Sequence, residues 1–445
     1  MRADGLPAIV IDTFREHYRQ LVEGATGMVG EQEICPAPRL PDAETLPPQL
    51  DAIGQQALGK TILLKLNGGL GTGMGLERAK SLLVVKEGLT FLDVIARQAL
   101  HAGAPLVLMN SFATHADSLP VLRRYPALNG AIPLDFVQHH VPKVRRSDLA
   151  PAVWPANPDL EWAPPGHGDI YTALVTSGML QTLLQHGYDY AFVSNADNLG
   201  AVMDVRLLGY FVQQGLPFMM ECANRTPMDR KGGHLAQRQG GQLLLRESAQ
   251  CPPQDVEHFQ DISRHRYFNT NNLWLHLPAL HALLQARNHI LGLPLIRNAK
   301  TVDPRDADST PVYQLETAMG SAIAIIPGAG AVRVPRSRFA PVKNTNDLLA
   351  VRSDAYLLTP EYHIIPNPQR RGEVVIDLDP RFYRLADDLE ARFPHGAPSL
   401  LACESLTVRG DVQFGAGVRV QGRVTIRAAE GEQKAIPAAA LLRSD

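Results

Sequence analysis

The sequence predicts an α/β fold in which a mostly parallel sheet with crossover helices precedes a small coil of stacked strands. Two observations support this prediction. Between residues 56 and 350, short apolar strands alternate with helical segments, which is the pattern of a parallel sheet. Near the C-terminus, apolar residues recur every six positions. That period fits neither a helix nor an ordinary hairpin, and it is typical of hexapeptide β-helices.

Length and composition are those of an ordinary globular protein and exclude several classes. The 445 residues are enough for two or three domains, and 45% of them are hydrophobic. The formal net charge is -2 without a long basic run, so nucleic acid is not an expected partner. The N-terminal residues lack a signal-peptide core, and no stretch is long and apolar enough to span a bilayer. We therefore expect a cytoplasmic protein without membrane attachment.

The four cysteines also favour a reducing compartment. They lie far apart and none belongs to a CxxC pair, so neither a zinc site nor a disulfide framework is expected. They are Cys35, Cys222, Cys251 and Cys403.

Changes in composition divide the chain into three parts. Residues 1–55 contain a predicted helix that ends before Gly24, followed by a Pro-rich linker at 36–48. Residues 56–350 form the α/β domain. Residues 351–445 form a C-terminal domain, with the β-helix at about 400–430.

The α/β domain contains three predicted buried strands and two predicted helices. The strands are Ile62–Leu66, Pro105–Asn110 and Tyr190–Ser194, and the helices are Phe91–Leu100 and Tyr171–His186. Ligands of such sheets bind at the carboxyl ends of the strands. The two most polar loops follow Leu66 and Ser194, so we expect the functional site between them.

The six-residue period near the C-terminus consists of two series that keep step. One series is Leu406, Val412, Val418 and Val424, and the other is Val408, Phe414, Val420 and Ile426. Gly410 and Gly422 lie between the pairs. A plain strand pair with chance spacing is the alternative, but two offset series over four repeats favour a coil of hexapeptides.

The loop LNGGLGTGMG, Leu66–Gly75, follows the first strand. Its glycines let the backbone approach a phosphate or a flat base, and their N–H groups can bind an anion. The loop is neither a P-loop, because Ala79 precedes Lys80-Ser81, nor a dinucleotide fingerprint, because Leu76 replaces the third glycine. Lys80 lies where it can reach a phosphate held by the loop. A tight turn followed by a solvated lysine is the alternative.

The segment NADN, Asn195–Asn198, follows the third strand. An aspartate in such a place can hold Mg²⁺ while substrate phosphates complete the coordination shell. Asp197 is therefore a candidate metal ligand, with an Asx turn as the alternative.

Three further segments carry candidate ligand-binding groups. PPGHGDIY places His167 between glycines, where it can donate to a phosphate or a sugar oxygen. FNTNNLW clusters amides that suit sugar hydroxyls, and RSRFAPVKNTNDLL contains Lys343 between Pro341 and Asn344. Each group taken alone is more often structural or solvated.

Taken together, the segments resemble the eukaryotic-type UTP–glucose-1-phosphate uridylyltransferase family, also called UDP-glucose pyrophosphorylases. The matching blocks occur in order from about residue 60 to about residue 430. They are KLNGGLGTGMG with AKSL, FVQHHVPKV, PPGHGDIY, FVSNADNLGA, KGGHLAQ, RYFNTNNLW, QLETAMGSAI, VPRSRFAPVKNTNDLL and LTVRGDVQFGAGVRVQGRVTI. Any one block is weak, but the ordered set is specific.

The resemblance implies a Rossmann-like nucleotidyltransferase domain with a mixed sheet, followed by a left-handed β-helix. It implies that UTP and glucose 1-phosphate give UDP-glucose and pyrophosphate by direct in-line displacement, with Mg²⁺ as cofactor. No nucleic acid and no membrane are implied as partners, and a homo-oligomer formed through the C-terminal domain is possible.

The resemblance also implies roles for individual residues. For the nucleotide, the backbone at Leu66, Asn67, Gly68 and Gly69 would hold the uridine and phosphates, Gln138 would contact the uracil, and Gly166 would pack nearby. For the sugar, His167 would touch the sugar phosphate, Asn195 and Ala196 would lie near the sugar, and Gly233 and Asn271 would line the glucose pocket. Asp197 would bind Mg²⁺, and Lys80 and Lys343 would be the catalytic cations at the phosphates. Ala79 departs from the family's usual proline and Ala196 from a usual β-branched residue, so the resemblance implies less about loop stiffness and sugar choice than about the reaction.

Three other functions are consistent with parts of the sequence. An enzyme of the same superfamily could take another sugar 1-phosphate. A hexapeptide-repeat acyltransferase is disfavoured, because four hexads are few and no histidine follows His395. A non-catalytic nucleotide-sugar sensor is disfavoured by the presence of Asp197, Lys80 and Lys343.

Overall fold

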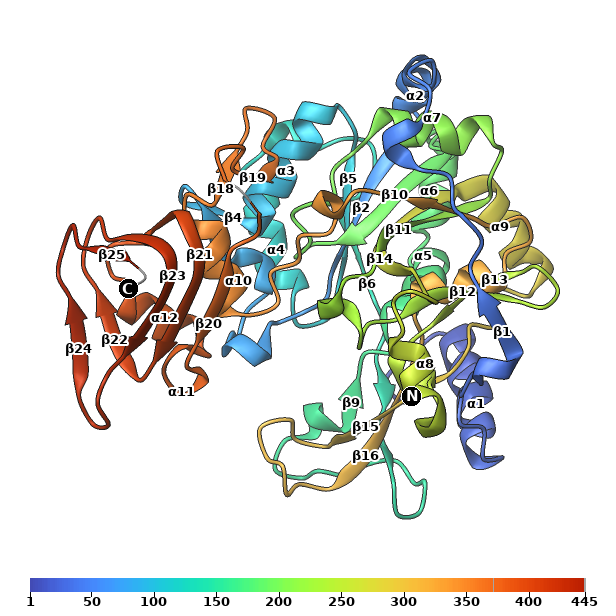
Figure 1. The fold of residues 1–445 in the computed structure, drawn as a ribbon. Coiled ribbons are helices and arrows are strands. Elements are labelled where there is room, and N and C mark those ends of the chain that lie inside the picture. The colour runs from blue at the N-terminus through green and yellow to red at the C-terminus, as the bar shows by residue number, and fades with distance from the viewer. Residues whose placement is uncertain (371, 444–445) are drawn as a thin grey trace.

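The computed structural model describes residues 1–370 and 372–443, and it has a large central sheet with a smaller stack of strands beside it. Figure 1 shows the sheet in the body of the molecule and the C-terminal strands, coloured red, at one side. The central sheet has ten strands in the order β1-β12-β14-β10-β2-β5-β6, with β13 beside β12, β11 beside β14, and β17 beside β11.

The central sheet is mixed. Its strands are β1 (Ile34–Pro36), β2 (Thr61–Asn67), β5 (Leu106–Asn110), β6 (Asp135–Val137), β10 (Tyr190–Asn195), β11 (Phe218–Asn224), β12 (His234–Arg238), β13 (Leu243–Arg246), β14 (Tyr267–His276) and β17 (Gly330–Arg333). The neighbours β10, β2, β5 and β6 pair in parallel, as the alternating pattern predicts. The long strand β14 runs antiparallel to β10 and β11, so the parallel arrangement holds for only part of the sheet.

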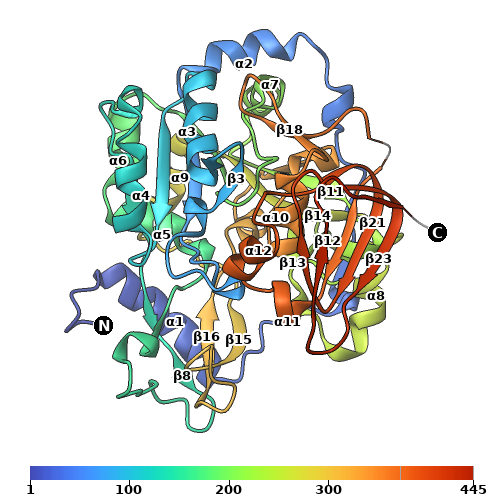
Figure 2. The same ribbon diagram turned by 90° about the vertical axis from the view of Figure 1, so that its left-hand side faces the viewer.

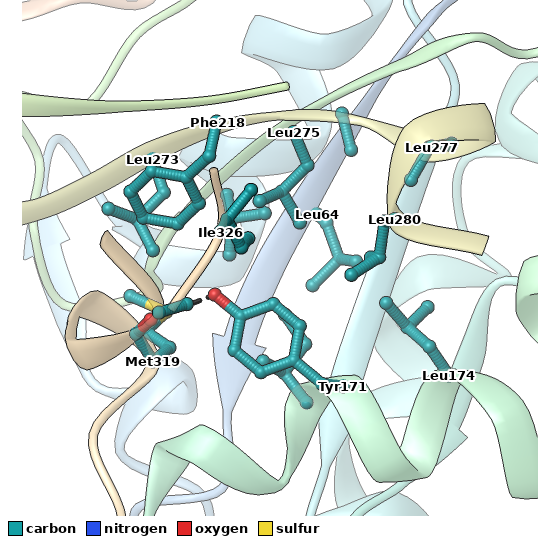
Figure 3. Close-up of a cluster of buried hydrophobic side chains, with 14 of the residues drawn as sticks. Leu64, Tyr171, Leu174, Phe218, Leu273, Leu275, Leu277, Leu280, Met319 and Ile326 are labelled. Carbon is teal, nitrogen blue, oxygen red and sulfur yellow. Dashed lines mark hydrogen bonds between the residues drawn. The ribbon is translucent and has the colours of Figure 1, made fainter. Parts of the chain in front are cut away.

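Helices cover both faces of the sheet. One face packs against α2 (Leu50–Leu58), α3 (Phe91–Ala102) and α7 (Val205–Gln213). The other packs against α5 (Ile170–Thr176), α6 (Met179–Gln185) and α9 (Leu277–Ala286). Strand β2 shows why: Ile62 and Leu64 belong to one core and Leu63 to the other, as the two-residue period of a strand requires. Figure 3 shows Leu64 within the core that contains α5, α6 and α9, where the Tyr171 hydroxyl donates to the carbonyl of Met319 at 2.8 Å.

The prediction of one helix over Tyr171–His186 is wrong. The segment forms two helices, α5 and α6, and Gly178 between them has φ of +73°. A residue in this left-handed conformation ends one helix before the next begins. The apolar period continues through both helices because both pack on the same face of the sheet, so periodicity alone does not reveal the break.

The N-terminal part begins with helix α1 (Ala8–Val22), as predicted. The Pro-rich segment then runs along the sheet, contributing β1 and placing Asp42 2.9 Å from Arg333 in β17. Helix α2 follows, and it was not predicted from the sequence. It packs closely on α7, since a Cβ on Gly54 would lie 1.7 Å from the carbonyl oxygen of Val205.

Smaller elements surround the large sheet. They are β3 (Val84–Lys86), β4 (Leu89–Thr90), α4 (His115–Leu122), β7 (Val141–Pro142), β8 (Val144–Arg145), β9 (Trp162–Ala163), α8 (Val256–Gln260), β15 (Ile296–Thr301), β16 (Pro311–Glu316), α10 (Thr345–Arg352), β18 (Tyr356–Leu358), β19 (Ile364–Pro366), α11 (Pro380–Tyr383) and α12 (Ala386–Arg392). Strands β15, β16 and β8 form a separate three-stranded sheet, and β18 and β19 form a hairpin.

The C-terminal strands stack in parallel. One sheet contains β20 (Val375–Leu378), β21 (Ser399–Arg409), β23 (Arg419–Arg427) and β25 (Leu441–Arg443), and a second contains β22 (Asp411–Phe414) and β24 (Gln433–Ile436). Leu406 pairs with Val424 and Val408 with Ile426, so the partner is one run of three hexapeptides further along the chain. All eight residues of the two periodic series are buried.

The C-terminal strands share their hydrophobic core with the body of the molecule. Met74 of the glycine-rich loop, Phe91 of α3 and Leu348 of α10 belong to the same buried cluster as Leu406 and Phe414. Within the described residues no helix is both long and apolar enough to cross a membrane. All four cysteines lie in the described part of the chain and are free.

Candidate active site

The two polar loops predicted to form the site meet at the carboxyl ends of β2 and β10. These strands pair in parallel with Asn195 opposite Leu66, and the Ala196 N–H donates to the Leu66 carbonyl at 3.0 Å. A cavity of about 310 Å³ opens there. It is lined by Leu66, Asn67, Gly68, Gly69, Lys80, Ser81, Met109, Gln138, Pro164, Gly166, His167, Asn195, Ala196 and Asp197. All the predicted site residues except Gly233, Asn271 and Lys343 are therefore in one place.

The start of the glycine-rich loop is fixed by hydrogen bonds of a buried side chain. The Asn67 side chain is buried and donates to Asn110 Oδ1 and to Ser118 Oγ, each at 2.7 Å. Its amide is thereby committed to the protein, which leaves the backbone of the loop to face a ligand. Gly71, further along, has φ of +72°, a conformation that favours glycine.

Gln138 lies directly against this loop. A Cβ built on Gly68 would come within 2.5 Å of Gln138 Nε2, so glycine at 68 is what allows the approach. The Gln138 backbone N–H donates to the carbonyl of Asn110 at 2.8 Å, which ties its segment to the end of β5. The glutamine amide thus offers one donor and one acceptor at the cavity wall.

His167 is held in a single tautomer. The backbone N–H of Met319 donates to His167 Nδ1 at 2.9 Å, so Nδ1 is the unprotonated nitrogen and Nε2 carries the hydrogen. Burial lowers the pKa of His167 to about 4, and the ring is neutral at physiological pH. Gly166 makes this placement possible, because a Cβ there would lie 2.4 Å from the Thr317 carbonyl oxygen. The ring is therefore a neutral hydrogen-bond donor at the cavity.

Asp197 and Lys80 form an ion pair at the cavity. Lys80 Nζ lies 2.6 Å from Asp197 Oδ2, and both side chains are largely shielded from solvent. The Lys80 N–H donates to the Gly69 carbonyl at 3.0 Å, which fixes the lysine against the glycine-rich loop. A cation and a carboxylate are thus available side by side where phosphates would enter.

The donors at the cavity fit Mg²⁺ better than a metal held by protein alone. Among residues 1–370 and 372–443, no three His, Cys, Asp or Glu side chains gather to hold an ion. Mg²⁺ commonly takes one or two carboxylates from the protein and completes its shell with water and substrate phosphates. Asp197, a carboxylate at the cavity beside the phosphate-binding loop, meets that requirement.

A buried network, which we call the Asn198 clamp, joins the Asp197 loop to the segment that carries Lys343. The Asn198 side chain donates to the Arg338 carbonyl at 3.1 Å and accepts from the Ala340 N–H at 2.9 Å. The Val342 N–H donates to the Asp197 carbonyl at 3.1 Å. The two segments thus lie antiparallel, as the bridge between Asn198 and Pro341 also records.

The clamp rests on a buried ion pair. Glu221 is fully buried, and its two carboxylate oxygens accept from Arg338 at 2.7 Å each. Asn272 Nδ2 and Trp274 Nε1 also donate to Glu221, at 3.0 and 2.9 Å. A buried charge is stable only when it is paired and fully hydrogen-bonded, and here these contacts satisfy the carboxylate.

Lys343 lies beside the site but does not line the cavity. Its side chain is exposed and its Nζ is 5.5 Å from the centre of the Phe339 ring. The Lys343 N–H donates to the Asp347 carboxylate at 2.7 Å, in the turn that begins α10. The clamp brings the backbone of this segment to Asp197, whereas the ammonium group points elsewhere.

Gly233 and Asn271 also lie outside the cavity. A Cβ on Gly233 would be 2.4 Å from Glu247 Oε2, so the glycine leaves room for that carboxylate. Asn271 has φ of +58°, and its side chain accepts from Asn269 Nδ2 at 2.7 Å. Burial raises the pKa of Glu247. Glu247 was not predicted, because no local pattern distinguishes it from a surface glutamate.

Three further residues that line the cavity were not predicted from the sequence. Pro164 belongs to the PPGHGDIY block, and Ser81 follows Lys80, so both are next to predicted residues. Met109 is in the buried strand β5, where its hydrophobic character indicates only core.

Comparison with known proteins gives one consistent result. The family profile of UTP–glucose-1-phosphate uridylyltransferase matches residues 11–421. A relative of that name from Solanum tuberosum is 43% identical over 397 residues, covering 87% of this chain and 81% of its own length. One from Saccharomyces cerevisiae is 39% identical, covering 87% of this chain and 78% of its own length.

Solved structures agree with the sequence comparison. The UDP-glucose pyrophosphorylase from Leishmania major, described in open and closed structures, superposes with a TM-score of 0.91 at 45% identity, over 100% of this chain and 97% of its own. A variant of that enzyme has been solved in complex with UDP-glucose. The protein from Trypanosoma brucei gives a TM-score of 0.88 at 43% identity, over 100% of this chain and 98% of its own. The chain therefore belongs to the UTP–glucose-1-phosphate uridylyltransferase family.

Proposed function

We propose that the chain transfers a uridylyl group from UTP to glucose 1-phosphate, giving UDP-glucose and pyrophosphate by direct in-line displacement with Mg²⁺. One observation carries the proposal: a single cavity combines the glycine-rich loop, Gln138, His167, Lys80 and Asp197. The names of the relatives support the same reaction.

The nucleotide end of the cavity is formed by the loop and Gln138. The backbone from Leu66 to Gly69 faces the uridine and its phosphates, and the Gln138 amide can pair with the donor and acceptor on the uracil edge. A site built to hydrogen-bond a base rejects bases that leave its polar groups unpaired. This arrangement supports a preference for UTP.

The phosphate end needs positive charge rather than a base. The attacking oxygen of glucose 1-phosphate is already an anion at neutral pH, so the difficulty is to bring two anions together. Asp197 would hold Mg²⁺, which would supply charge neutralisation at the transferring phosphoryl group. Lys80 holds a second positive charge beside the glycine-rich loop, and the neutral His167 donates its Nε2 hydrogen to a sugar-phosphate oxygen.

Lys343 is the third proposed cation. It must turn away from Phe339 to reach a phosphate, and its long side chain allows this because the ammonium group is exposed.

Alignment of the two substrates supplies much of the remaining rate increase, roughly 7–11 kcal/mol at most.

The glucose pocket is assigned to Gly233 and Asn271, with Asn195 and Ala196 also near the sugar. We add Glu247, whose carboxylate lies against Gly233 and can accept from sugar hydroxyls. Other hexose 1-phosphates differ from glucose 1-phosphate at those hydroxyls, so this pocket decides the choice of sugar.

We further infer that the C-terminal strands form a left-handed β-helix that serves folding and assembly. The pairing of strands three hexapeptides apart supports a three-sided coil. Its last strand leaves an edge that can pair with another chain.

We also propose that the chain divides into residues 1–55, 56–350 and 351–445, and that the protein is cytoplasmic.

The deciding experiment is a pyrophosphate-release assay with UTP, Mg²⁺ and a panel of sugar 1-phosphates. We expect release with glucose 1-phosphate, and much less with N-acetylglucosamine 1-phosphate or when UTP is replaced by ATP or CTP. A protein that binds UDP-glucose but releases no pyrophosphate with any of these sugars would be a sensor rather than an enzyme.

A further inference from the structure

A second cavity, of about 320 Å³, lies on the other side of β2 from α5 and α6. Its walls come from α2, β2, α3 and the segment at 201–205 that follows the Asp197 loop. His363, from the hairpin of β18 and β19, completes it. Figure 2 shows α2, α3 and β18 at the same end of the molecule. We call it the Lys65 cavity, and it shares no lining residue with the active-site cavity.

The ionisable groups that line the Lys65 cavity are all bases. They are Lys65, His101 and His363, and among the described residues that line it there is no Asp or Glu. Gln98 adds an amide, whose Nε2 donates to the Tyr362 carbonyl at 2.8 Å and leaves its oxygen side free of that contact. A cavity with bases and without carboxylates is complementary to an anion.

Lys65 is the most unusual of these groups because it is 2% exposed and bonded only to neutral acceptors. Its Nζ donates to Ser194 Oγ at 2.6 Å and to the Ala201 carbonyl at 2.7 Å. An ammonium group has three donors, so one remains. Burial lowers the pKa of Lys65 to about 7, with a further lowering from Arg338 and an opposing effect from Glu221.

Glu221 does not act as the direct partner of Lys65. Its two oxygens are occupied by Arg338, Asn272 and Trp274. A buried amine without a carboxylate partner has a lowered pKa, because desolvation disfavours its charged form. An anion in the adjacent cavity would supply the missing counter-charge.

The two histidines are less buried than Lys65. Burial lowers the pKa of His363, Glu361 opposes this, and His101 and Arg338 add to it. Arg97 stacks on the Tyr362 ring at 5.1 Å, which adds positive charge to the same hairpin. Glu361 is partly exposed on the hairpin and does not line the cavity.

We propose that the Lys65 cavity binds a small anion with a phosphate or carboxylate group, and that Lys65 transmits its binding to the active site. Two covalent and hydrogen-bonded connections support the transmission. Lys65 is directly followed by Leu66 and Asn67 of the active-site cavity, and its partner Ser194 is directly followed by Asn195. An anion that attracts the ammonium group would therefore act on the residues next to both loops that form the active site.

The test is calorimetric titration of the full chain with inorganic phosphate and, separately, with succinate, which distinguishes a phosphate ligand from a carboxylate one. The Lys80→Ala variant serves as the background, because phosphate can also enter the active site. We expect one of the two anions to bind to Lys80→Ala. The double change His101→Gln with His363→Gln in that background should weaken binding about tenfold or more, since two ring N–H donors to the anion are lost.

Lys65→Met should abolish the binding, and it should also abolish proton uptake. Binding to the unmodified lysine near pH 7 should take up a fraction of a proton, seen as a difference between buffers of unlike ionisation enthalpy. His395→Gln, on an exposed histidine, is the matched control and should change neither affinity nor proton uptake. Should Lys65→Met fail to fold, the histidine double variant still decides the question.

The proposal is overturned if neither anion binds to Lys80→Ala, or if the histidine double variant binds as tightly as its background. Transmission, which rests on the proposed function, is tested separately in otherwise unmodified protein. There the binding anion should shift the KM for UTP, and the histidine double variant should remove the shift. A bound anion without any such shift would contradict transmission, whereas absence of UDP-glucose synthesis in unmodified protein would contradict the proposed function itself.

Discussion

His167 enters the site as a neutral donor because two local features act together. The Met319 N–H occupies Nδ1, and burial lowers the pKa to about 4. An unfolded histidine becomes charged below about pH 6.5, whereas the folded protein keeps this ring neutral until about pH 4. Stability should therefore fall as pH drops through this window, since the unfolded state binds the proton first.

The first prediction follows from this state of His167. Replacing it by alanine removes the Nε2 donor and should lower kcat/KM by about 10²-fold, the usual cost of losing one preorganised donor. The pH profile of kcat/KM for unmodified protein should contain no step between pH 6 and 8 that His167→Ala removes. Steady-state kinetics with circular dichroism as a folding control would check both points, and a step near pH 6.5 that disappears in the variant would contradict the neutral-donor role.

The second prediction concerns Lys343, which lies near the site but points away from it. If it meets charge that develops in the transition state, Lys343→Ala should lower kcat by about 10²–10³-fold and raise the KM for UTP far less. A lysine that stays over Phe339 would give a change of only a few-fold. Lys434→Ala, on an exposed lysine of the C-terminal strands, is the matched control.

The third prediction concerns Gln138 and the choice of base. Gln138→Ala should lower kcat/KM for UTP and bring it closer to the values for CTP and ATP, because the pairing with uracil is lost. Turnover of the three nucleotides would be compared at fixed glucose 1-phosphate. Equal turnover of all three by the unmodified protein would show that Gln138 does not select the base.

At the scale of elements, the sequence predicts what is local and misses what is made between distant segments. The strands that end at Asn67 and Asn195 are short, mostly apolar runs. Each is followed directly in the sequence by its polar loop, so strand and loop can be recognised together. Glu221 and Arg338 are far apart in the sequence, and each resembles a surface charge. Their burial as a pair follows only from the pairing of β11 with β14 and β17.

The same reasoning explains the wrong assignment of Tyr171–His186 and the absence of α2 from the elements predicted from the sequence. The break at Gly178 was missed because both helices keep the same apolar face. Helix α2 was missed because it is short and contains Gly54, a poor helix former, and its position depends on contact with α7 through Gly54 and Gly209. In both cases, tertiary packing decided the structure and local propensity did not.

The fourth prediction tests the Asn198 clamp as a link between two segments. Asn198→Ala should lower kcat because it releases the segment of Lys343 from the Asp197 loop. If the clamp acts through Lys343, the same change in a Lys343→Ala background should cost clearly less, giving an interaction energy of about 0.5–3 kcal/mol. Additive losses would show that Asn198 serves only stability, and Asn129→Ala, on an exposed loop, controls for the substitution itself.

At the scale of the molecule, the division at residue 350 is crossed by one hydrophobic core. The glycine-rich loop contributes Met74, and the loop between α11 and α12 places Leu385 against it, since a Cβ on Gly75 would come within 3.0 Å of the Leu385 side chain. The C-terminal strands therefore support the position of the nucleotide loop as well as one another. This indicates one cooperative unit rather than two domains that unfold separately.

The fifth prediction is that the whole chain unfolds in a single transition whose midpoint depends on the C-terminal core. Phe414 is 1% exposed and stacks on Phe393 at 4.6 Å. Phe414→Ala should destabilise the protein by about 3–5 kcal/mol, and loss of nucleotide binding should coincide with loss of secondary structure. Circular dichroism and the fluorescence of a bound nucleotide analogue, followed through the same thermal ramp, would compare the two. Val375→Ala, on an exposed valine of β20, should leave the midpoint almost unchanged. Two separate transitions, with Phe414→Ala moving only one of them, would show instead that residues 351–445 fold independently, because a shared core requires both parts to unfold together.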